Sequence, residues 1–315
     1  MRSAEGELAL GLDIGGTSSR ALVCDLGGQV LGRGEAGGGN PNSHPAATAA
    51  REVERAAAAA LADLDPGRVR AAVLGMAGDS AMVDPDVAAA FDAVWGRVGL
   101  GCRAQVVADS EVAFAAGTAE PTGTVLIAGT GAIAARVERH RLVATAGGHG
   151  WLLGDEGSAF WLGREAVRHA LRALEDRGPR DALVEQVLRA LGADERRRVI
   201  TAVTTAPPVR LAELAPLVTE SAGEGVPAAV ETARRAAELL AETARATRRG
   251  ADTSPVVLAG SLVGAGNPVG AALRAELASA DLRTAGPGAA GAAWLAARQR
   301  QPANSAQRHR RLLGS

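Results

Sequence analysis

The sequence predicts an α/β protein with two mixed sheets that are flanked by helices. A pattern of strand, glycine turn, strand and strand begins near residue 8 and recurs from residue 124. Each occurrence is followed by alternating helix-like and strand-like segments, as in α/β domains. At 315 residues the chain is also long enough for two domains of ordinary size.

The first half opens with the short apolar run at residues 8–13, followed by the runs ALVCDL and QVLGRGEA. Gly27 and Gly28 separate these two runs, which is a hairpin signal. The turn after residue 13 therefore leads into another strand, whereas a dinucleotide-binding fingerprint leads from its strand into a helix. We expect no dinucleotide-binding fold.

The rest of the first half alternates helices and strands. A flexible polar loop at 37–45 precedes a helix over about 46–64, which Asp65-Pro66-Gly67 ends. A buried strand, VRAAVLGMAG, then leads to a helix over about 85–98. The strand AQVVAD, which ends in Asp109, and the short helix SEVAFAAG complete this half.

The second half repeats the opening with a strand at 124–128, the turn Gly129-Thr130-Gly131-Ala132 and the strands IAARVER and RLVATA. A glycine-rich stretch at 147–158 leads into a helix over about 158–175. The elements expected after it are helices near 179–191, 194–203, 207–222 and 227–249, a strand at 255–259, a helix near 268–279, the strand DLRTA and a helix near 288–298. The polar, basic tail is expected to be disordered.

The composition excludes several classes of function. A net charge of −1 argues against a large nucleic-acid footprint, and we read the arginines and glutamates of the helices as solvated faces. Neither a signal peptide nor a run of roughly 18–20 apolar residues is visible, so we expect a cytoplasmic protein without membrane contact. Cys24 and Cys102 form no CxxC pair, which argues against a disulfide framework or a zinc site. The sequence contains no lysine, which excludes a Schiff base and a Walker A loop.

Two glycine-threonine turns, at 15–17 and 129–131, point to phosphate binding. Backbone N–H groups in such turns form an anion-binding concavity, and the threonine hydroxyl adds a donor. Asp13, at the end of the first strand, is placed to hold Mg²⁺ directly or through water. The stretch 147–158 combines glycines, which allow close approach of a ligand, with carboxylates that suit a ligand rich in hydroxyl groups. It is also longer than an ordinary connection of about 4–6 residues.

Four motifs resemble the sugar kinase, actin and Hsp70-type ATPase superfamily: DIGGTSSR at 13–20, the acid after VVA at 109, GTGA at 129–132 and GDEGSAFWLG at 154–163. Within it the chain is most similar to the N-acetylglucosamine kinase group, which has a BadF/BadG-type ATPase domain. The resemblance implies two ribonuclease H-like (actin-like ATPase) domains with ATP-Mg²⁺ in an interdomain cleft that closes on the sugar. The implied domains are residues 1–118 plus 286–300 and residues 119–285, with 301–315 as a disordered tail.

The resemblance assigns Mg²⁺ binding to Asp13. It assigns ATP to the two phosphate turns and to a turn under the adenosine, namely Gly15, Gly16, Thr17, Ser18, Gly129, Thr130, Gly131, Gly260 and Ser261. The family often carries a basic residue where this chain has Ser18, and the nearest cation here is Arg20. The sequence therefore does not identify which cation, if any, assists Mg²⁺ in neutralising the phosphates.

The resemblance makes Asp109 the catalytic base, which accepts or orients the proton of the sugar hydroxyl. As a strand-end acid, Asp109 is alternatively a cap for the helix that follows. The residues implied for the amino sugar, with Asp109, are Asn40, Gly150, Trp151 and Asp155, and we add His149 and Glu156.

Alternatives remain open for the sugar-binding residues. Asn42 is an alternative to Asn40, which lies in a loop suited to closing over the cleft. Trp151 either stacks on the sugar or packs in the core, and Asp155 either binds sugar hydroxyls or caps a helix. Glu156 either contacts the sugar or buttresses the loop. His149 either donates to the sugar or is a structural hydrogen-bonding residue.

The leading hypothesis is an ATP-dependent kinase for the 6-hydroxyl of a free amino sugar, either glucosamine or N-acetylglucosamine. ATP, Mg²⁺ and the sugar are then its ligands, and the resemblance favours a homodimer. An ATPase activator of a radical enzyme is an alternative, but it needs paired cysteines on an iron–sulfur cluster. A non-catalytic sugar sensor on the same fold is a further alternative, and it would be expected to lack the base or a phosphate turn.

Overall fold

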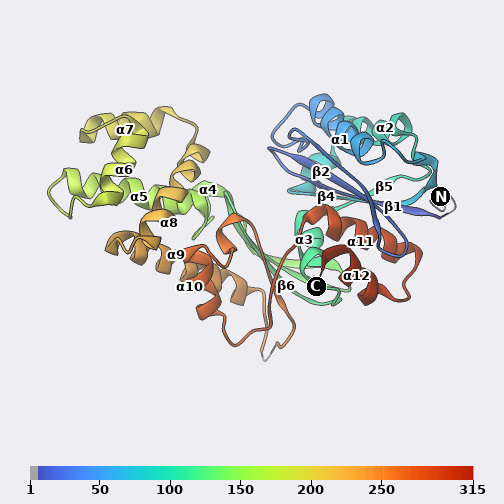
Figure 1. Cartoon of the computed structure of the whole chain (residues 1–315). Coiled ribbons are helices and arrows are strands. Elements are labelled where there is room, and N and C mark those ends of the chain that lie inside the picture. Colours follow the sequence, from blue (N-terminus) through green and yellow to red (C-terminus); the bar gives the residue numbers. More distant parts are fainter. Residues whose placement is uncertain (1–5, 251, 315) are drawn as a thin grey trace. The chain divides into compact units, whose positions relative to one another are not determined.

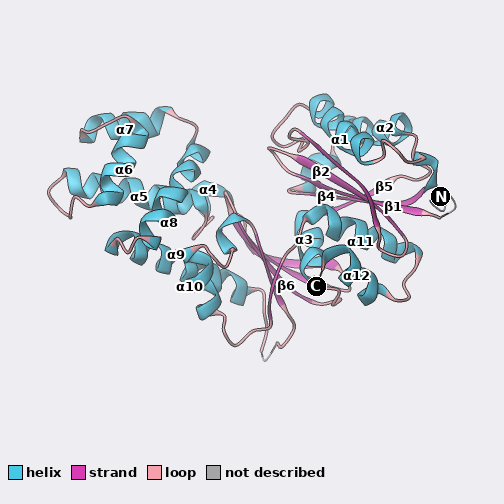
Figure 2. Ribbon diagram, in the orientation of Figure 1, coloured by secondary structure: helices cyan, strands magenta, loops and turns pink. Residues whose placement is uncertain are grey.

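A computed structural model describes residues 6–250 and 252–314. The chain forms two compact units, which are considered separately (Figure 1). Unit 1 comprises Met1–Thr122, Val137–Leu142 and Ala285–Ser315. Unit 2 comprises Gly123–Arg136 and Val143–Thr284. Each unit contains a five-stranded sheet with helices packed against it, as the sequence predicts (Figure 2).

The sheet of unit 1 places the ends of three parallel strands along one edge. Its strand order is β3 (Val30–Ala36), β2 (Ser19–Asp25), β1 (Leu8–Ile14), β4 (Val69–Met76) and β5 (Ala104–Ala108). Strands β1, β4 and β5 run parallel, and β2 is antiparallel to β1 and β3. Ile14 pairs with Met76, which pairs with Ala108. The residues next to these three positions therefore meet at the carboxyl edge, where α/β sheets bind ligands.

Helices cover both faces of this sheet (Figure 1). Leu8, Leu10 and Leu12 of β1 pack toward α1 (Ala46–Ala60) and α2 (Pro85–Val98). Ala9 packs on the other face with α3 (Asp109–Gly117) and α11 (Gly288–Arg300). This alternation follows from the period of two in a strand, which turns successive side chains to opposite faces. The short 3₁₀ helices η1 (Pro66–Arg68) and η2 (Asp79–Val83) flank β4.

The expected disordered tail is instead a helix, α12 (Ser305–Leu313), that belongs to unit 1. Arg308, His309 and Leu312 are buried, and Leu312 joins the core beside α11. The indole nitrogen of Trp294 on α11 donates to the carbonyl of Ser305 at 2.9 Å. The expectation was wrong because the basic composition of the tail hides an amphipathic pattern, whose buried residues recur at helical spacing.

The sheet of unit 2 repeats the strand order of unit 1, which the recurring sequence pattern predicts. The order is β10 (Leu282–Thr284), β9 (Val256–Ala259), β6 (Gly123–Ala128), β7 (Ala132–Glu138) and β8 (Arg141–Gly147). Strand β6 takes the position of β1, and β9 and β10 run parallel to it. Arg139 and His140 join β7 to β8 at the hairpin tip, which is counted with unit 1. Both have positive φ, as a two-residue type I′ hairpin turn requires.

The remaining helices belong to unit 2, and all of them except the exposed α4 contribute buried residues to one core. They are α4 (Gly150–Leu153), α5 (Ala159–Leu174), α6 (Ala182–Leu191), α7 (Arg196–Thr205), η3 (Pro208–Leu214), α8 (Ala215–Gly223), α9 (Pro227–Ala246), η4 (Ser261–Val263) and α10 (Pro268–Glu276). Ser158 caps α5 by accepting a hydrogen bond from the amide of Trp161 at 3.2 Å. Within the described ranges, no helix combines the length and apolar character needed to cross a membrane.

Candidate active site

Asp13 and Asp109 lie at the carboxyl edge of the sheet of unit 1. Asp13 is the penultimate residue of β1, and Asp109 follows the last residue of β5 and begins α3. Burial raises the pKa of the Asp13 carboxyl, and the negative charge of Asp109 raises it further, while Arg20 partly opposes both effects. The edge therefore concentrates negative charge, and a divalent cation would relieve it.

Asp109 does not occupy the capping position of its helix. The N-cap of α3 is Ala108, and Asp109 is the first helical residue. One carboxylate oxygen of Asp109 accepts from the amide of Ser110 at 2.8 Å. The capping alternative is therefore not the geometry observed, and the carboxylate is oriented by the first turn of its own helix.

Gly288 at the start of α11 is a site residue that sequence reasoning missed. A Cβ at this position would overlap the carboxylate of Asp13. The helix can begin beside Asp13 only because residue 288 has no side chain. The N-terminus of α11 carries partial positive charge, which favours a nearby carboxylate. The sequence signal for this arrangement is the Pro287-Gly288 pair at the helix start.

The first phosphate turn is held by the loop at 37–45. The amide of Gly15 donates to the carbonyl of Ser18 at 2.9 Å, which closes the turn. The imidazole Nε2 of His44 lies 2.6 Å from the carbonyl oxygen of Gly16. The hydroxyl of Ser19 donates to the carbonyl of Gly37 at 2.8 Å. The loop that the sequence predicts to be flexible is therefore anchored to the turn at both ends, and His44 was not among the predicted site residues.

The loop at 37–45 packs so closely that side chains larger than hydrogen do not fit at Gly38 and Gly39. A Cβ at Gly38 would overlap both the carbonyl of Gly16 and the imidazole of His44. A Cβ at Gly39 would press on Ser19 and Val53. The run of glycines before Asn40 is therefore explained by close approach of two backbone segments.

Asn40 and Asn42 both bind the backbone that follows β4. Asn40 is buried, and its amide nitrogen donates to the carbonyl of Ala77 at 2.8 Å. Its carbonyl oxygen accepts from the amide of Asn42 at 2.8 Å. The exposed side chain of Asn42 donates to the carbonyl of Gly78. An asparagine amide offers two donors and two lone pairs, so each side chain retains further hydrogen-bonding capacity.

In unit 2, the second phosphate turn is held by the N-terminus of α5. The amide of Ala159 donates to the carbonyl of Gly129 at 2.9 Å, and that of Phe160 to the carbonyl of Thr130 at 3.1 Å. The amide of Gly129 donates to the carbonyl of Gly131 at 3.0 Å. The carbonyl groups of the turn are thus paired within the protein, which fixes the shape of the turn.

Asp155 lies directly against this turn. Its backbone is left-handed, with φ of 56°, and one carboxylate oxygen accepts from the amide of Ala132 at 3.1 Å. A Cβ at Gly131 would come within 2.8 Å of the same oxygen. Because Ser158 caps α5, the capping alternative for Asp155 is wrong. The sequence did not predict this contact with the phosphate turn.

Gly260 also reaches the second phosphate turn. Its φ is 101°, and a Cβ there would overlap the backbone of Ala128, the residue before Gly129. Unit 2 therefore brings together three separate predicted segments, namely residues 129–131, Asp155 and the turn at 260–261. In unit 1, the first phosphate turn likewise lies beside the loop that carries Asn40.

The segment 149–156 presents apolar and polar side chains at its surface. Trp151 is 45% exposed and its ring centroid lies 5.9 Å from that of Phe160. Trp151 is therefore not a core residue, and part of the residue remains accessible. His149 is exposed and packs on Gly154. A carboxylate oxygen of Glu156 lies 3.5 Å from the guanidinium of Arg164, which favours a buttressing role over sugar contact.

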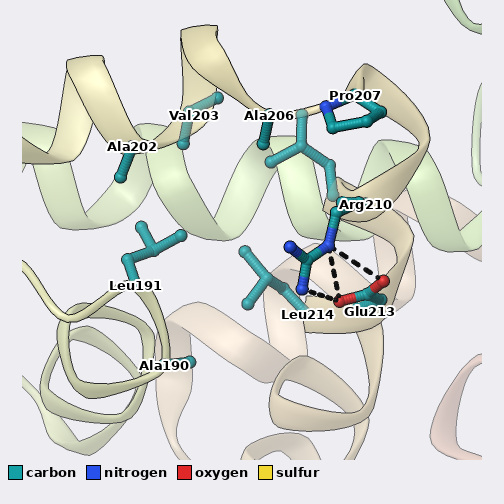
Figure 3. A pocket seen from close by; sticks show the side chains of 10 residues that line it. Ala190, Leu191, Ala202, Val203, Ala206, Pro207, Arg210, Glu213 and Leu214 are labelled. Atoms are coloured by element: carbon teal, nitrogen blue, oxygen red, sulfur yellow. Dashed lines mark hydrogen bonds and ion pairs between the residues drawn. The ribbon is translucent and has the colours of Figure 1, made fainter.

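One apolar cavity of unit 2 is separate from these residues (Figure 3). It has a volume of about 170 Å³ and lies between α6, α7 and η3. Leu191, Val203 and Leu214 line it, and the pair Arg210–Glu213 lies at its margin. None of the predicted site residues lines this cavity. Its lining offers no arrangement for phosphoryl transfer.

Comparison with known proteins gives a consistent result. The sequence profile of the BadF/BadG/BcrA/BcrD ATPase family matches residues 10–296. A protein named N-acetyl-D-glucosamine kinase from Dictyostelium discoideum is 30% identical over 232 residues, which cover 70% of this chain and 72% of that protein. The N-acetylmuramic acid/N-acetylglucosamine kinase of Clostridium acetobutylicum is 28% identical over 181 residues, 57% of this chain and 58% of the relative.

Solved structures show the same fold. A Chromobacterium violaceum protein described as an N-acetylglucosamine kinase superposes with a TM-score of 0.75 and 27% identity, covering 92% of this chain and 98% of the other. A ROK family glucokinase from Streptomyces griseus, solved with glucose and AMPPNP, has a TM-score of 0.58 and 22% identity, with coverage of 93% and 99%. The predicted class of two actin-like ATPase domains is confirmed by these likenesses together with the two sheets.

Proposed function

The chain belongs to the BadF/BadG/BcrA/BcrD ATPase family, and from this premise we propose that it is an ATP-dependent kinase that phosphorylates the 6-hydroxyl group of a free amino sugar. Two relatives are named as sugar kinases. One of them is 30% identical over more than two thirds of both chains. One observation carries the proposal. Asp13 and Asp109 lie near each other at one edge of the sheet, next to a glycine-threonine turn.

Asp109 takes the role of the base in this proposal. Its carboxylate is fixed by the amide of Ser110, so it can orient the 6-hydroxyl and accept its proton as the phosphoryl group arrives. Phosphoryl transfer depends mainly on positioning and on charge stabilisation. A carboxylate held by its own helix turn meets the first of these needs.

Asp13 is the proposed protein ligand of Mg²⁺. Among the described residues, no group of three or more histidine, cysteine, aspartate or glutamate side chains could hold a metal by itself. Mg²⁺ does not need such a cage, because it keeps several waters and takes one or two carboxylates together with substrate phosphates. The raised pKa of Asp13 marks an uncompensated carboxylate that a cation would suit. When bound, Mg²⁺ neutralises charge on the transferred phosphoryl group.

The proposal assigns the phosphates of ATP to the two glycine-threonine turns. Gly15, Gly16, Thr17 and Ser18 would bind phosphate through backbone N–H and hydroxyl groups, as would Gly129, Thr130 and Gly131. Gly260 and Ser261, which lie against the second turn, would contact the adenosine. Arg20, the cation nearest to Ser18 in sequence, pairs with the exposed Glu35 at 3.2 Å.

The proposal assigns the sugar to Asn40, Gly150, Trp151 and Asp155. Only one carboxylate oxygen of Asp155 has a hydrogen bond among the described residues, and the other would accept from ring hydroxyls. The exposed position of Trp151 would allow its ring to stack on the apolar side of a pyranose. His149 is a secondary candidate in the same segment, whereas Glu156 is assigned the buttressing role through Arg164.

The cysteines argue against the activator alternative. Cys24 is fully buried, and burial raises the pKa of its thiol to about 12. Burial also raises the pKa of the half-buried Cys102. Iron–sulfur ligation needs accessible thiolates, and neither cysteine is suited to supply one.

The experiment that tests the kinase proposal is an ADP-release assay with glucosamine, N-acetylglucosamine, glucose and N-acetylmannosamine. We expect one of the two glucosamine sugars to give the highest kcat/KM. The 6-deoxy analogue of that sugar should release no ADP above background. If none of the sugars stimulated ADP release, the kinase proposal would be wrong.

A further inference from the structure

Unit 1 contains a polar cavity where α12 meets the turn between β2 and β3. Its volume is about 110 Å³, which exceeds the ~30 Å³ share of a single liquid water. Arg308 and Arg311 line it, together with the side chains of Gln301, Asn304 and Gln307 and the turn at 26–27. No acidic residue is among the described residues that line it.

Arg308 places a buried positive charge in this cavity. The residue is 3% exposed. Each hydrogen bond that its guanidinium makes to a described residue goes to a neutral oxygen. Nε donates to the carbonyl of Leu26 at 2.7 Å, and Nη1 to that of Gln301 at 2.9 Å. Nη2 donates to the side chain of Gln301 and to the carbonyl of Ala303, both at 3.3 Å. Four of the five N–H groups are thus used, and one remains on Nη1.

The charge of Arg308 is not balanced by a contacting carboxylate. In the part of the chain that the structure describes, no acidic side chain lies within ion-pair distance of Arg308 or Arg311. The nearest acid is Asp25, whose Oδ1 accepts from the amides of Gly27 and Gln29, each at 2.8 Å. Burial lowers the pKa of Arg308, and the nearby Cys24 and Asp25 only partly oppose this effect. Burying an arginine without a paired anion is costly.

Arg311 and the start of α12 add donors to the same cavity. Arg311 is exposed, and its Nη1 lies 3.3 Å from the carbonyl oxygen of Gly27. The first intrahelical bond of α12 runs from the amide of Arg308 to the carbonyl of Asn304, so the preceding amides are free of intrahelical partners. Two guanidinium groups, three side-chain amides and a helix start therefore surround one small space.

We propose that this cavity binds a phosphoryl group, either as free phosphate or as the phosphate of a small monoester. Arginine offers a planar set of N–H donors that matches phosphate oxygens. Occupancy would complete the pairing of Arg308 and would tie α12 to the turn between β2 and β3. The cavity would thus act as a stabilising anion site that is additional to the kinase site.

The cavity is separate from the proposed catalytic residues of unit 1. In the register of β1 with β2, Asp25 pairs with Leu8, whereas Ser19 pairs with Ile14. The turn after Asp25 therefore lies at the amino end of β1, and Asp13 lies near its carboxyl end. Phosphate bound to the glycine turn at 15–17 would therefore not contact Arg311.

The test compares two variants of the full-length chain that each remove one positive charge from α12. Arg311→Ala removes a group that lines the cavity, and Arg310→Ala removes its neighbour, which does not line it. Thermal unfolding is measured against increasing inorganic phosphate, with sodium chloride at matched ionic strength as the reference. A ligand that binds only the folded state raises Tm with concentration.

We expect the wild type and Arg310→Ala to gain stability with phosphate, and Arg311→Ala to need about tenfold more phosphate for the same gain. A parallel titration with glycerol phosphate distinguishes free phosphate from a phosphate monoester. If the response to only one of these two ligands depends on Arg311, that ligand is the one that the cavity binds. Equal responses of the two variants to both ligands would overturn the proposal, and so would an equal effect of chloride. Phosphate bound at the kinase site would act on both variants alike.

Discussion

His44 and Gly16 join two segments that are 28 residues apart. The imidazole Nε2 of His44 lies 2.6 Å from the carbonyl oxygen of Gly16 in the first phosphate turn. The same loop carries Asn40, the candidate sugar ligand. One side chain thus couples the shape of the proposed phosphate site to the loop of the proposed sugar site.

We expect His44→Ala to lower kcat/KM for ATP by about 10- to 100-fold, because a misplaced phosphate turn no longer orients the substrate. Gly38→Ala should have the same effect, since its Cβ would displace the imidazole. His44→Gln, which retains a donor, should recover part of the activity. Steady-state kinetics with varied ATP measure these effects. An ATP KM and kcat for His44→Ala within twofold of wild type would show that the contact is dispensable.

Asp109→Asn should reduce turnover by about 10³–10⁴-fold, because the amide cannot accept the hydroxyl proton. The amide oxygen can still accept from Ser110, so the fold and sugar affinity should be retained. Calorimetric titration with the sugar and single-turnover kinetics separate the two effects. Substantial turnover by this variant would remove Asp109 from the catalytic role.

Asp13→Asn should stabilise the protein while it disables the enzyme. A folded-state pKa above that of the unfolded chain means that the contribution of Asp13 to stability is greatest below the unfolded pKa and is lost as pH rises through the folded pKa. Above the folded-state pKa the ionised carboxylate is therefore unfavourable, and its neutral replacement should raise Tm. Mg²⁺ should raise the Tm of the wild type more than that of the variant.

The control for Asp13 is Asp92→Asn, which alters an exposed carboxylate away from the sheet edge. It should change neither activity nor the response to Mg²⁺. A lower Tm for Asp13→Asn above the folded-state pKa would contradict the role of desolvation at this position.

His140 should make stability depend on pH in the acidic range. Burial, Arg298 and His309 lower the pKa of His140 to about 4, and its ring packs edge-on against Trp294 at 5.2 Å. A lowered folded-state pKa means that the stabilising contribution is complete above about pH 6.5 and is lost as pH falls toward 4. The loss amounts to about 3 kcal/mol for 2.5 pKa units.

His140→Asn should flatten this dependence, since asparagine tolerates the left-handed φ of 62° and carries no titrating group. Denaturant unfolding between pH 4 and 7 provides the measurement. His149→Asn, which alters an exposed histidine, is the matched control and should leave the dependence unchanged. Identical pH curves for the wild type and His140→Asn would exclude this residue as the cause.

Two substitutions of Asp155 should change the KM values for sugar and for ATP differently. Asp155→Asn keeps an oxygen that accepts from Ala132, so it should raise the sugar KM about tenfold and leave the ATP KM unchanged. Asp155→Ala also releases the second phosphate turn and should raise both. Glu156→Gln, which removes only a partly exposed ion pair, should change either KM little. A rise confined to the ATP KM in Asp155→Asn would assign the carboxylate to the nucleotide instead.

The local pattern of the chain predicted most of its elements. Alternating apolar residues and glycine turns gave the strands of both sheets, and the repeat gave their common order. The helix expected over 85–98 is α2 at Pro85–Val98, where Asp84 and Gly99 cap the two ends. The glycine stretch at 147–158 was less predictable, because it contains the short helix α4, whose residues are largely exposed.

The contacts of the site needed the tertiary structure. His44 and Gly288 belong to segments far in sequence from Gly16 and Asp13, and no local pattern relates them. The same holds for Asp155, whose contact with the turn at 131–132 depends on a left-handed backbone that only the folded loop imposes. The basic tail likewise became a helix only because unit 1 buries Leu312 and His309.

The sequence by itself therefore determined the two sheets, the two glycine-threonine turns and the acid at each strand end, because periodicity and turn chemistry are local properties. Tertiary structure alone decided which side chain supports which turn, since those contacts join residues brought together by strand pairing and helix packing. The charged residues of unit 1 illustrate the same distinction between sequence and tertiary structure. Composition shows how many there are, and folding gathers Asp13 with Asp109 at one end of β1 and Arg308 with Arg311 at the other.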